Sequence, residues 1–328
     1  MTDPTFHRRR IVQMLAALGA LPSLAMAQGG WPSRPIKVVV PFPAGGALDT
    51  VARALSEPMQ QRLGQSMVID NKPGAGARLG TEVAAKSPGD GYTLLVATPS
   101  STSVALALVP GLTYDPMKDL VPIANLAEII NVIVVPAPRP YRNVAEFVTW
   151  ARQQNRPITF GTSGVGSADH LGGEMFKLKT GLPMEHVPYK GGGLAMADLA
   201  TERLDVAFAT QAAAGPMLAS GKVRAIAVTT PTRSKLLPDL PAVSETVPGF
   251  GMSNWAGMFL PKGTPDRIRD RLFKEFAEVA NMPAVRETIA RGGMEVKVSQ
   301  SPQEFSRQLH EETQVWTALV KALDLKPE

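Results

Sequence analysis

Two glycine-containing turns hold the residues whose types and spacing could bind a ligand. The first turn, PFPAGG at 41–46, follows a β-branched run at 36–40 and precedes a helical apolar stripe at 47–57. A strand that leads through such a turn into a helix leaves unpaired backbone N–H groups at the helix start, where the helix dipole also favours an anion. The turn lacks both the Lys-Ser/Thr pair of a P-loop and the G-x-G-x-x-G spacing. It therefore predicts an oxyanion site suited to a carboxylate, with an ordinary strand-to-helix turn as the alternative.

The second turn, GTSGVGS at 161–167, repeats this pattern between a strand and a helix predicted at 168–179. Its serine/histidine cluster consists of Ser163 or Ser167 with His170, but no serine is flanked as G-x-S-x-G and no P-loop lysine is present. A serine hydrolase is therefore the weaker alternative to a binding protein. The two turns together predict two helix N-termini that face one cleft.

A hydroxyl-rich segment, TPSSTS at 98–103, follows the buried strand predicted at 92–97. In open α/β sheets, ligands bind just beyond the carboxyl ends of the strands, so Ser100 and Ser101 are candidate ligand-binding residues. The alternative role of this segment is to cap the helix predicted at 104–109, and both roles could hold together.

Composition excludes several classes of protein. The 328 residues are enough for two domains, and the net charge of +5 is not gathered into a Lys/Arg run with interleaved aromatic residues, so a nucleic-acid partner is not expected. The sequence contains no cysteine, which excludes disulfides, a thiol nucleophile and Cys-ligated metals. We expect neither a metal site nor a cofactor.

The first 27 residues read as a secretory signal. A basic segment at 7–10 (HRRR) precedes an apolar run at 11–21, and AMA at 25–27 is an A-x-A cleavage site. The apolar run is too short to span a bilayer, and no other stretch is long and apolar enough. We therefore expect cleavage after Ala27 and a soluble mature chain in the periplasm.

The remaining pattern predicts two α/β domains with strands alternating with helices. An apolar run at 129–135 reads as one strand, and the proline-rich segment after it as the first crossover between domains. A second crossover is expected near 249–259. These boundaries predict a discontinuous first domain, 28–134 plus 252–328, and a second domain, 135–251.

Several motifs, weak singly and specific together, occur in one order along the mature chain. They are WPSRPIKVVVPFPAGGALD at 31–49, NKPGAG at 71–76, DGYTLL at 90–95, G-x-x-G-x-G-S-x-x-H-L at 161–171, VPYKG at 187–191, GKVRAIAV at 221–228, PDLP at 238–241, W-x-G at 255–257 and GTP at 263–265. In this order they resemble the extracytoplasmic solute receptors of tripartite tricarboxylate transporters, the Bug family.

The resemblance implies a periplasmic-binding-protein fold: two α/β domains joined by a two-strand hinge, with a ligand cleft between them. It implies a monomeric receptor that delivers a small organic acid to membrane transporter subunits and does not catalyse a reaction. A carboxylate would be held by the loops at 42–49 and 162–170, with Asp49 orienting water or a ligand donor. The expected site residues are Phe42, Ala44, Gly45, Gly46, Asp49, Ser100, Ser101, Thr162, Ser163, Gly164, Gly166, Ser167, His170, Tyr189, Ala209 and Thr210.

One position departs from the family pattern. Many members carry an aspartate where this chain has Ala209, and an aspartate would suit a ligand ammonium group. This favours a plain organic acid over an amino acid. His170 could either pack near the helix start or contact ligand, whereas Lys190 is expected to be a turn lysine in solvent. A periplasmic sensor partner that signals through a receptor kinase would share the same fold and cleft, so it stays an alternative to transport.

Overall fold

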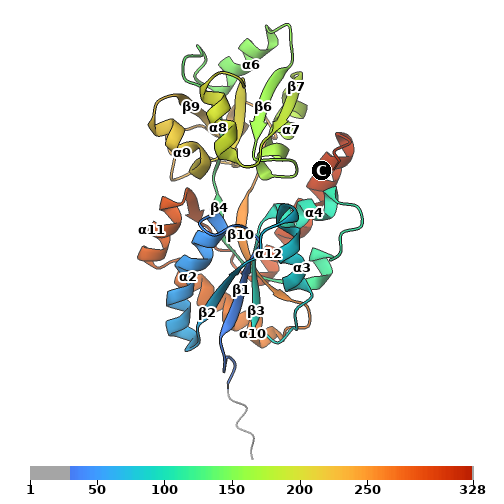
Figure 1. Ribbon diagram of the computed structural model, residues 1–328, viewed down its shortest axis with the longest axis vertical. Helices are drawn as coiled ribbons and strands as arrows, with labels where there is room; N and C mark the ends of the chain where they lie inside the picture. Colours follow the sequence, from blue (N-terminus) through green and yellow to red (C-terminus); the bar gives the residue numbers. More distant parts are fainter. Residues whose placement is uncertain (1–29, 327–328) are drawn as a thin grey trace, which may run out of the picture.

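The computed structural model describes residues 30–326 as two α/β units, one above the other in Figure 1. The lower unit contains a six-stranded sheet with the order β11-β4-β10-β3-β1-β2, and the upper unit a five-stranded sheet with the order β7-β6-β8-β5-β9. The predicted leader at 1–27 lies outside the described residues. Within 30–326, no helix combines the length and apolarity that a membrane span requires.

The lower unit is built from both ends of the described chain. Its elements are β1 (Ile36–Val40), α2 (Ala47–Leu63), β2 (Met67–Asn71), η1 (Ala75–Ala77), α3 (Arg78–Ala85), β3 (Thr93–Ala97), η2 (Pro99–Ser101), α4 (Ser103–Leu108), α5 (Pro116–Asp119), β4 (Leu120–Ile129), β10 (Trp255–Pro261), α10 (Asp266–Ala280), α11 (Pro283–Arg291), β11 (Met294–Val296) and α12 (Pro302–Ala322). Strand β1 pairs in parallel with β2 and β3, whereas β10 pairs antiparallel with β3 and β4. Strand β1 is buried on both faces of this sheet, because Val38 and Val39 point into apolar clusters on opposite faces.

The upper unit is formed by the middle of the chain. Its elements are β5 (Asn131–Pro136), α6 (Val144–Arg152), β6 (Ile158–Thr162), α7 (Ala168–Thr180), β7 (Met184–Pro188), α8 (Gly192–Ala200), β8 (Val206–Thr210), α9 (Gln211–Ala219), β9 (Val223–Val228) and η3 (Val243–Glu245). Strands β6, β7 and β8 are parallel, and β5 runs antiparallel between β8 and β9. Both predicted strand–turn–helix units, β1 to α2 and β6 to α7, are confirmed.

The apolar run at 129–135 is two strands rather than the predicted one. Strand β4 ends at Ile129 in the lower sheet, and β5 begins at Asn131 in the upper sheet, so the chain crosses between the units at Ile130. The predicted boundary between 134 and 135 therefore lies inside β5. Both strands are buried, so the sequence stays apolar through the change of sheet.

The return crossing lies beside the first. The Ile129 N–H donates to the Asn254 carbonyl at 2.7 Å, and the Met252 N–H donates to the Thr229 carbonyl at 2.9 Å. Asn254 immediately precedes β10, which pairs with β4. Two adjacent segments therefore connect the units, in agreement with the implied two-strand hinge.

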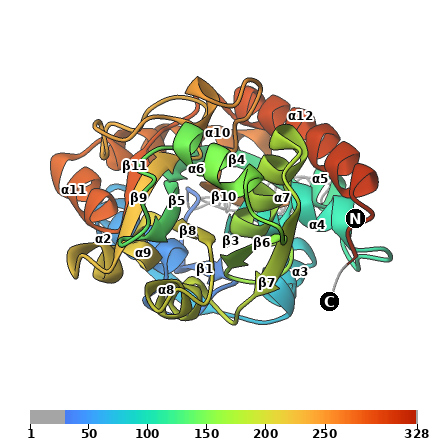
Figure 2. The ribbon, with the colours of Figure 1, turned by 90° about the horizontal axis from the view of Figure 1, so that it is seen from above.

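The C-terminal helix α12 packs against both units. Phe305 and Leu309 belong to an apolar cluster of the lower sheet, whereas Trp316 and Leu319 belong to the cluster that contains Phe160 of the upper sheet. The helix lies beside α4 (Figures 1 and 2). This contact adds an apolar connection to the two crossing segments.

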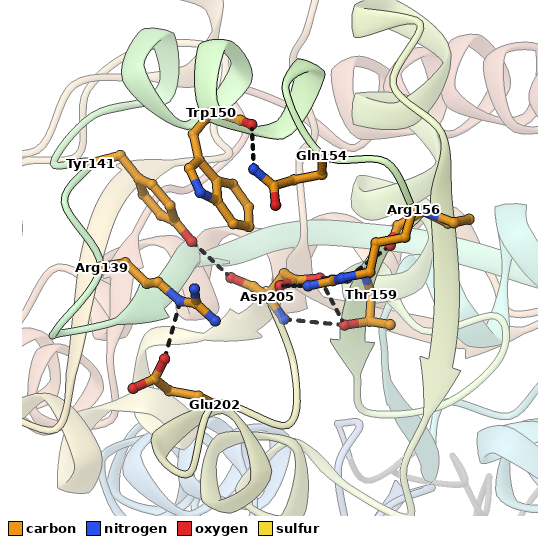
Figure 3. A network of polar contacts seen from close by, with 9 residues as sticks. Arg139, Tyr141, Trp150, Gln154, Arg156, Thr159, Glu202 and Asp205 are labelled. Carbon is orange, nitrogen blue, oxygen red and sulfur yellow. Dashed lines mark hydrogen bonds and ion pairs between the residues drawn. The ribbon is translucent and has the colours of Figure 1, made fainter.

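A polar network fixes the upper unit at the amino end of β6, the end opposite Thr162 (Figure 3). The Asp205 side chain, 2% exposed, accepts two bonds from the Arg156 guanidinium, at 2.6 and 2.7 Å, and one from the Thr159 N–H at 3.0 Å. The Tyr141 hydroxyl donates to the Asp205 carbonyl at 3.3 Å. These bonds hold the start of β6 to the segment before β8 and so set the position of the loop that follows β6.

Candidate functional site

A pocket of about 280 Å³ lies between the two units and is lined by the first turns of two helices. Gly46, Ala47 and Leu48 come from the start of α2, and Ala168 and Asp169 from the start of α7. The first N–H groups of a helix have no partner within the helix, and the helix dipole places partial positive charge there. Two such helix ends, one from each unit, converge on the same space.

On the lower side, Asp49 organises the loop before α2. Its Oδ2 accepts from the Gly45 N–H and from Arg53 Nε, both at 2.8 Å, and its Oδ1 accepts from Asn71 Nδ2 at 3.0 Å. Burial alone would raise the pKa of the Asp49 carboxyl, but the Arg53, Gly45 and Asn71 bonds outweigh it and hold this pKa below its usual value. Both oxygens are engaged away from the pocket.

On the upper side, Asp169 faces the pocket and is 3% exposed. Its carboxylate accepts from Ser163 Oγ at 2.5 Å and from Asn131 Nδ2, and no Lys, Arg or His within 30–326 pairs with it. Burial raises the pKa of this carboxyl to about 6, although the Ser163 and Asn131 bonds oppose the rise. Asp169 is therefore a buried acid whose charge is stabilised, among the described residues, by neutral donors.

A chain of hydrogen bonds links Asp169 to both crossing segments. Asn131, the first residue of β5, donates to Asp169 and accepts from Asn254 Nδ2 at 3.0 Å. Asn254 itself lines the pocket. The pocket wall, the start of α7 and the two crossings between units thus form one connected polar group.

The pocket continues into a second hollow of about 290 Å³. The two share Phe42, Ser100, Ser163 and Ser167. The second hollow, which we call the outer lobe, is further lined by Gly76, Arg78, Val104, Ala105, Leu108, Val109, Gly164, Val165 and Gly166. The cleft therefore has an inner end at the two helix N-termini and an outer end near Arg78.

Comparison with known proteins identifies the family. Residues 51–325 match the family model described as tripartite tricarboxylate transporter family receptor. The chain belongs to this receptor family. It is 32% identical over 323 residues to Protein BugT of Bordetella pertussis, covering 96% of this chain and 99% of that one.

Solved structures agree with this assignment. Rpa4515 of R. palustris with adipate is 34% identical, with a TM-score of 0.79 over 91% of this chain and 100% of that chain. MatC (Rpa3494) from Rhodopseudomonas palustris with bound malate is 30% identical, with a TM-score of 0.75 over 88% and 100% of the two chains. The resemblance to Bug-family receptors and the predicted periplasmic-binding-protein fold are confirmed.

About half of the predicted site residues line the cleft of this receptor. They come from four separate loops and are Phe42, Gly46, Ser100, Ser163, Gly164, Gly166, Ser167 and Thr210. Two of the hydroxyls are also helix caps: Ser167 Oγ accepts from the His170 N–H at 3.1 Å, and Thr210 Oγ1 accepts from the Ala213 N–H at 3.2 Å. Capping and cleft lining therefore occur in the same residues.

The other predicted residues do not line the two hollows, and three of them, Asp49, Thr162 and His170, support the loops instead. Thr162 is buried, and its hydroxyl is 2.6 Å from His186 Nε2. His170 is buried against His186, with ring centroids 4.1 Å apart, and its Nδ1 accepts from the Gly166 N–H at 3.2 Å. Of its two predicted roles, the structure places His170 in the packed one. Burial lowers the pKa of His170 to about 4, so the ring is neutral at pH 7.

Four further predicted residues lie outside the two hollows. Ala44 and Gly45 are exposed and line neither hollow. Ser101 is buried and bonds to Thr98 through its side chain, and the Tyr189 hydroxyl donates to Asp198 Oδ2 at 2.8 Å.

Ala209 corrects an inference about the ligand. Its side chain is fully buried in the apolar cluster that contains Val132, which pairs with it across the sheet, so it does not face the cleft. The argument that Ala209 disfavours an amino-acid ligand therefore loses its basis. The acidic side chain in the pocket is Asp169.

Sequence reasoning did not predict Asp169, Asn254, Ile129 or Arg78 as lining residues. Asn254 and Ile129 belong to the crossing segments, and only the three-dimensional fold brings them to the pocket. Arg78 lies two residues after the end of the NKPGAG motif, and this position was the available signal.

A larger hollow of about 550 Å³ lies elsewhere, lined by residues that include Arg34, Lys37, Asp70 and Tyr92. It opens at the amino ends of β1 and β3, whereas ligands of open α/β sheets bind at the carboxyl ends. The cleft between the units is therefore the better candidate.

Proposed function

We propose that this receptor captures a small organic carboxylate in the cleft between its two sheets and delivers it to the membrane subunits of a tripartite transporter. The observation that carries the proposal is the convergence of the α2 and α7 first turns on one pocket. The adipate and malate bound to two relatives support the same ligand class.

The carboxylate is bound mainly by backbone. The first-turn N–H groups of Ala47, Leu48 and Ala168 supply donors, and the hydroxyls of Ser100 and Thr210 lie in the same walls. Water can bridge the remaining distance between these groups and the ligand. Binding at helix ends requires no lysine or arginine at the inner end of the cleft.

Ligand binding also favours closure of the two units. The two helix N-termini belong to different units, so a carboxylate that contacts both is bound best when the units are close. A ligand shifts a conformational equilibrium by its difference in affinity for the two states. The adjacent crossings at Ile130 and Asn254 are the segments about which the units would rotate.

We also propose that the receptor is not a hydrolase. Ser163 Oγ donates to Asp169, Ser167 Oγ donates to the Gly164 carbonyl, and the His170 ring accepts from a backbone N–H. A Ser–His nucleophile would need its serine hydroxyl bonded to the histidine ring, and neither Ser163 nor Ser167 bonds to the His170 ring in the part of the chain that the structure describes. Turnover of an acetyl ester by the purified protein, abolished in His170→Ala, would contradict this proposal.

The direct test of binding is isothermal titration calorimetry with mono-, di- and tricarboxylates of two to six carbons. A neutral control is the amide of each acid, which keeps the shape and removes the charge. We expect saturable one-to-one binding of at least one acid and at least a tenfold loss on amidation, equal to about 1.4 kcal/mol. Absence of binding by every acid, or equal binding of acid and amide, would refute the function.

Export with cleavage after Ala27 is part of the proposal. The family of periplasmic receptors and the basic, apolar and A-x-A segments at 7–27 support it. Protein from the periplasmic fraction should begin at Gln28 by intact mass. Full-length protein retained in the cytoplasm would contradict the proposed location.

A further inference from the structure

Arg78 places a cation at the outer lobe of the cleft, with no side-chain partner in the part of the chain that the structure describes. It lines this lobe and is half-buried, and no ion pair or side-chain hydrogen bond joins it to another residue within 30–326. The acidic residue one helical turn later, Glu82, is paired with Lys86 instead. Among the described residues that line the two connected hollows, the charged ones are Asp169 and Arg78.

The backbone before Arg78 is held in an uncommon conformation. The four residues at 74–77 all have positive φ, and two of them are alanines, Ala75 at 49° and Ala77 at 73°. Residues other than glycine rarely adopt such angles, and they persist where the surrounding structure enforces them, often at ligand-contacting segments. Gly76 of this segment also lines the outer lobe.

Close packing fixes this segment to the rest of the cleft. A Cβ at Gly80 would lie 2.7 Å from the Lys72 carbonyl oxygen and 2.8 Å from Pro41 Cβ, so α3 approaches the loop as closely as a glycine permits. At the other end, Asn71 Nδ2 donates to the Phe42 carbonyl at 3.2 Å and to Asp49. The Arg78 backbone is therefore set relative to the loop before α2.

We propose that Arg78 binds the second carboxylate of a dicarboxylate whose first carboxylate occupies the helix N-termini of the inner pocket. The proposal rests on the proposed function and adds the substrate class. The two hollows are continuous through Phe42, Ser100, Ser163 and Ser167, so a short aliphatic chain can connect the two anionic groups. A guanidinium presents paired N–H donors that match the two oxygens of a carboxylate.

The arrangement assigns different functions to the two ends of the cleft. The inner end, built from backbone, binds any carboxylate, and the outer end distinguishes a dicarboxylate from a monocarboxylate of equal length. A monocarboxylate would leave Arg78 facing its methyl end, without the charge-assisted bonds.

The test compares matched acids by calorimetry at low ionic strength. The pairs are succinate with butyrate, glutarate with valerate, and adipate with hexanoate, titrated into the wild type, Arg78→Gln and Lys190→Gln. Lys190 is exposed and lines neither hollow, so it controls for the general loss of a positive charge. Thermal unfolding without ligand checks that each variant is folded.

We expect the wild type to bind at least one dicarboxylate about tenfold or more tightly than its matched monocarboxylate. Arg78→Gln should remove this preference by weakening dicarboxylate binding alone, while Lys190→Gln leaves it intact. Equal wild-type affinities within every pair, or a preference that survives in Arg78→Gln, would overturn the proposal but not the proposed function. Failure of every acid to bind would overturn both.

Discussion

At the scale of single residues, Asp169 makes the stability of the protein depend on pH. Its pKa in the folded protein is about 6, above the ordinary value of 3.8, because the carboxyl is buried. Its contribution to stability is therefore complete below pH 4 and is lost as the pH rises through 6. A rise of this size corresponds to roughly 3 kcal/mol between the two protonation states.

Asp169→Asn removes this titration and keeps a side chain of the same shape. The free energy of unfolding of the variant minus that of the wild type should therefore increase as the pH rises from 4.5 to 7.5. Urea unfolding at several pH values measures this difference. His170 and His186, with pKa values lowered to about 4 and about 3, act in the opposite direction, but both proteins contain them. A difference that is constant with pH would show that Asp169 does not titrate in this range.

Asp205 is a buried charge that holds the start of β6 in the upper unit. Replacing it with alanine removes the acceptor of two Arg156 bonds and of the Thr159 N–H bond, and the guanidinium keeps its bond to the Pro157 carbonyl (Figure 3). Because the Arg156 side chain is 52% exposed, water can replace part of its lost bonding, and the variant should lose about 1–3 kcal/mol, which urea unfolding would measure.

The control for Asp205→Ala is Glu287→Ala, which breaks the exposed pair with Arg291 on α11. Those side chains are 69% and 70% exposed, so the cost should stay below about 1 kcal/mol. Similar losses in the two variants would contradict the structural role of Asp205.

At the scale of elements, carboxylate binding by the loop before α7 should depend more on the backbone conformation of the loop than on a nearby charge. Gly164 has φ of +126°, and an added Cβ would lie 3.3 Å from the Tyr189 carbonyl oxygen. Gly164→Val should therefore weaken carboxylate binding by about tenfold or more, because a β-branched residue cannot keep this conformation without strain. Lys190→Ala, at an exposed position outside the cleft, should change affinity by less than about twofold.

Gly181→Val is the matched control for backbone strain. Gly181 ends α7 at its other terminus with φ of +67° and lies away from both hollows. This variant should lose stability and retain affinity, measured by calorimetry below its unfolding temperature. If Lys190→Ala lost more affinity than Gly164→Val, a point charge rather than the helix ends would hold the carboxylate. Gly46, at φ of −76°, is not in the left-handed region, so the same reasoning does not apply to it.

The elements that could be predicted are those with local signals. The valines of β1, the glycines of both turns and the apolar stripe of α2 each act within a few residues, and they gave the two strand–turn–helix units. No local sequence signal showed which of the two first-turn aspartates faces the cleft. Asp49 is the third residue of α2 and Asp169 the second of α7, and one residue turns a side chain by about 100° around a helix.

At the scale of the whole molecule, the crossing between units was the main error. A run that is buried in both sheets stays apolar from 129 to 135, so nothing in its composition marks the change at Ile130. The lining roles of Asn254 and Ile129 were missed for the same reason, because they arise only when the two crossings lie side by side.

In the proposed function, one carboxylate is held by the first turns of α2 and α7. Millisecond hydrogen exchange with and without the tightest-binding acid measures those amide groups directly. We expect ligand-dependent protection within 46–50 and 163–170, with no change at 34–37 or 90–93 beside the larger hollow. Protection confined to the latter segments, or absent from either helix start at saturating ligand, would contradict the account.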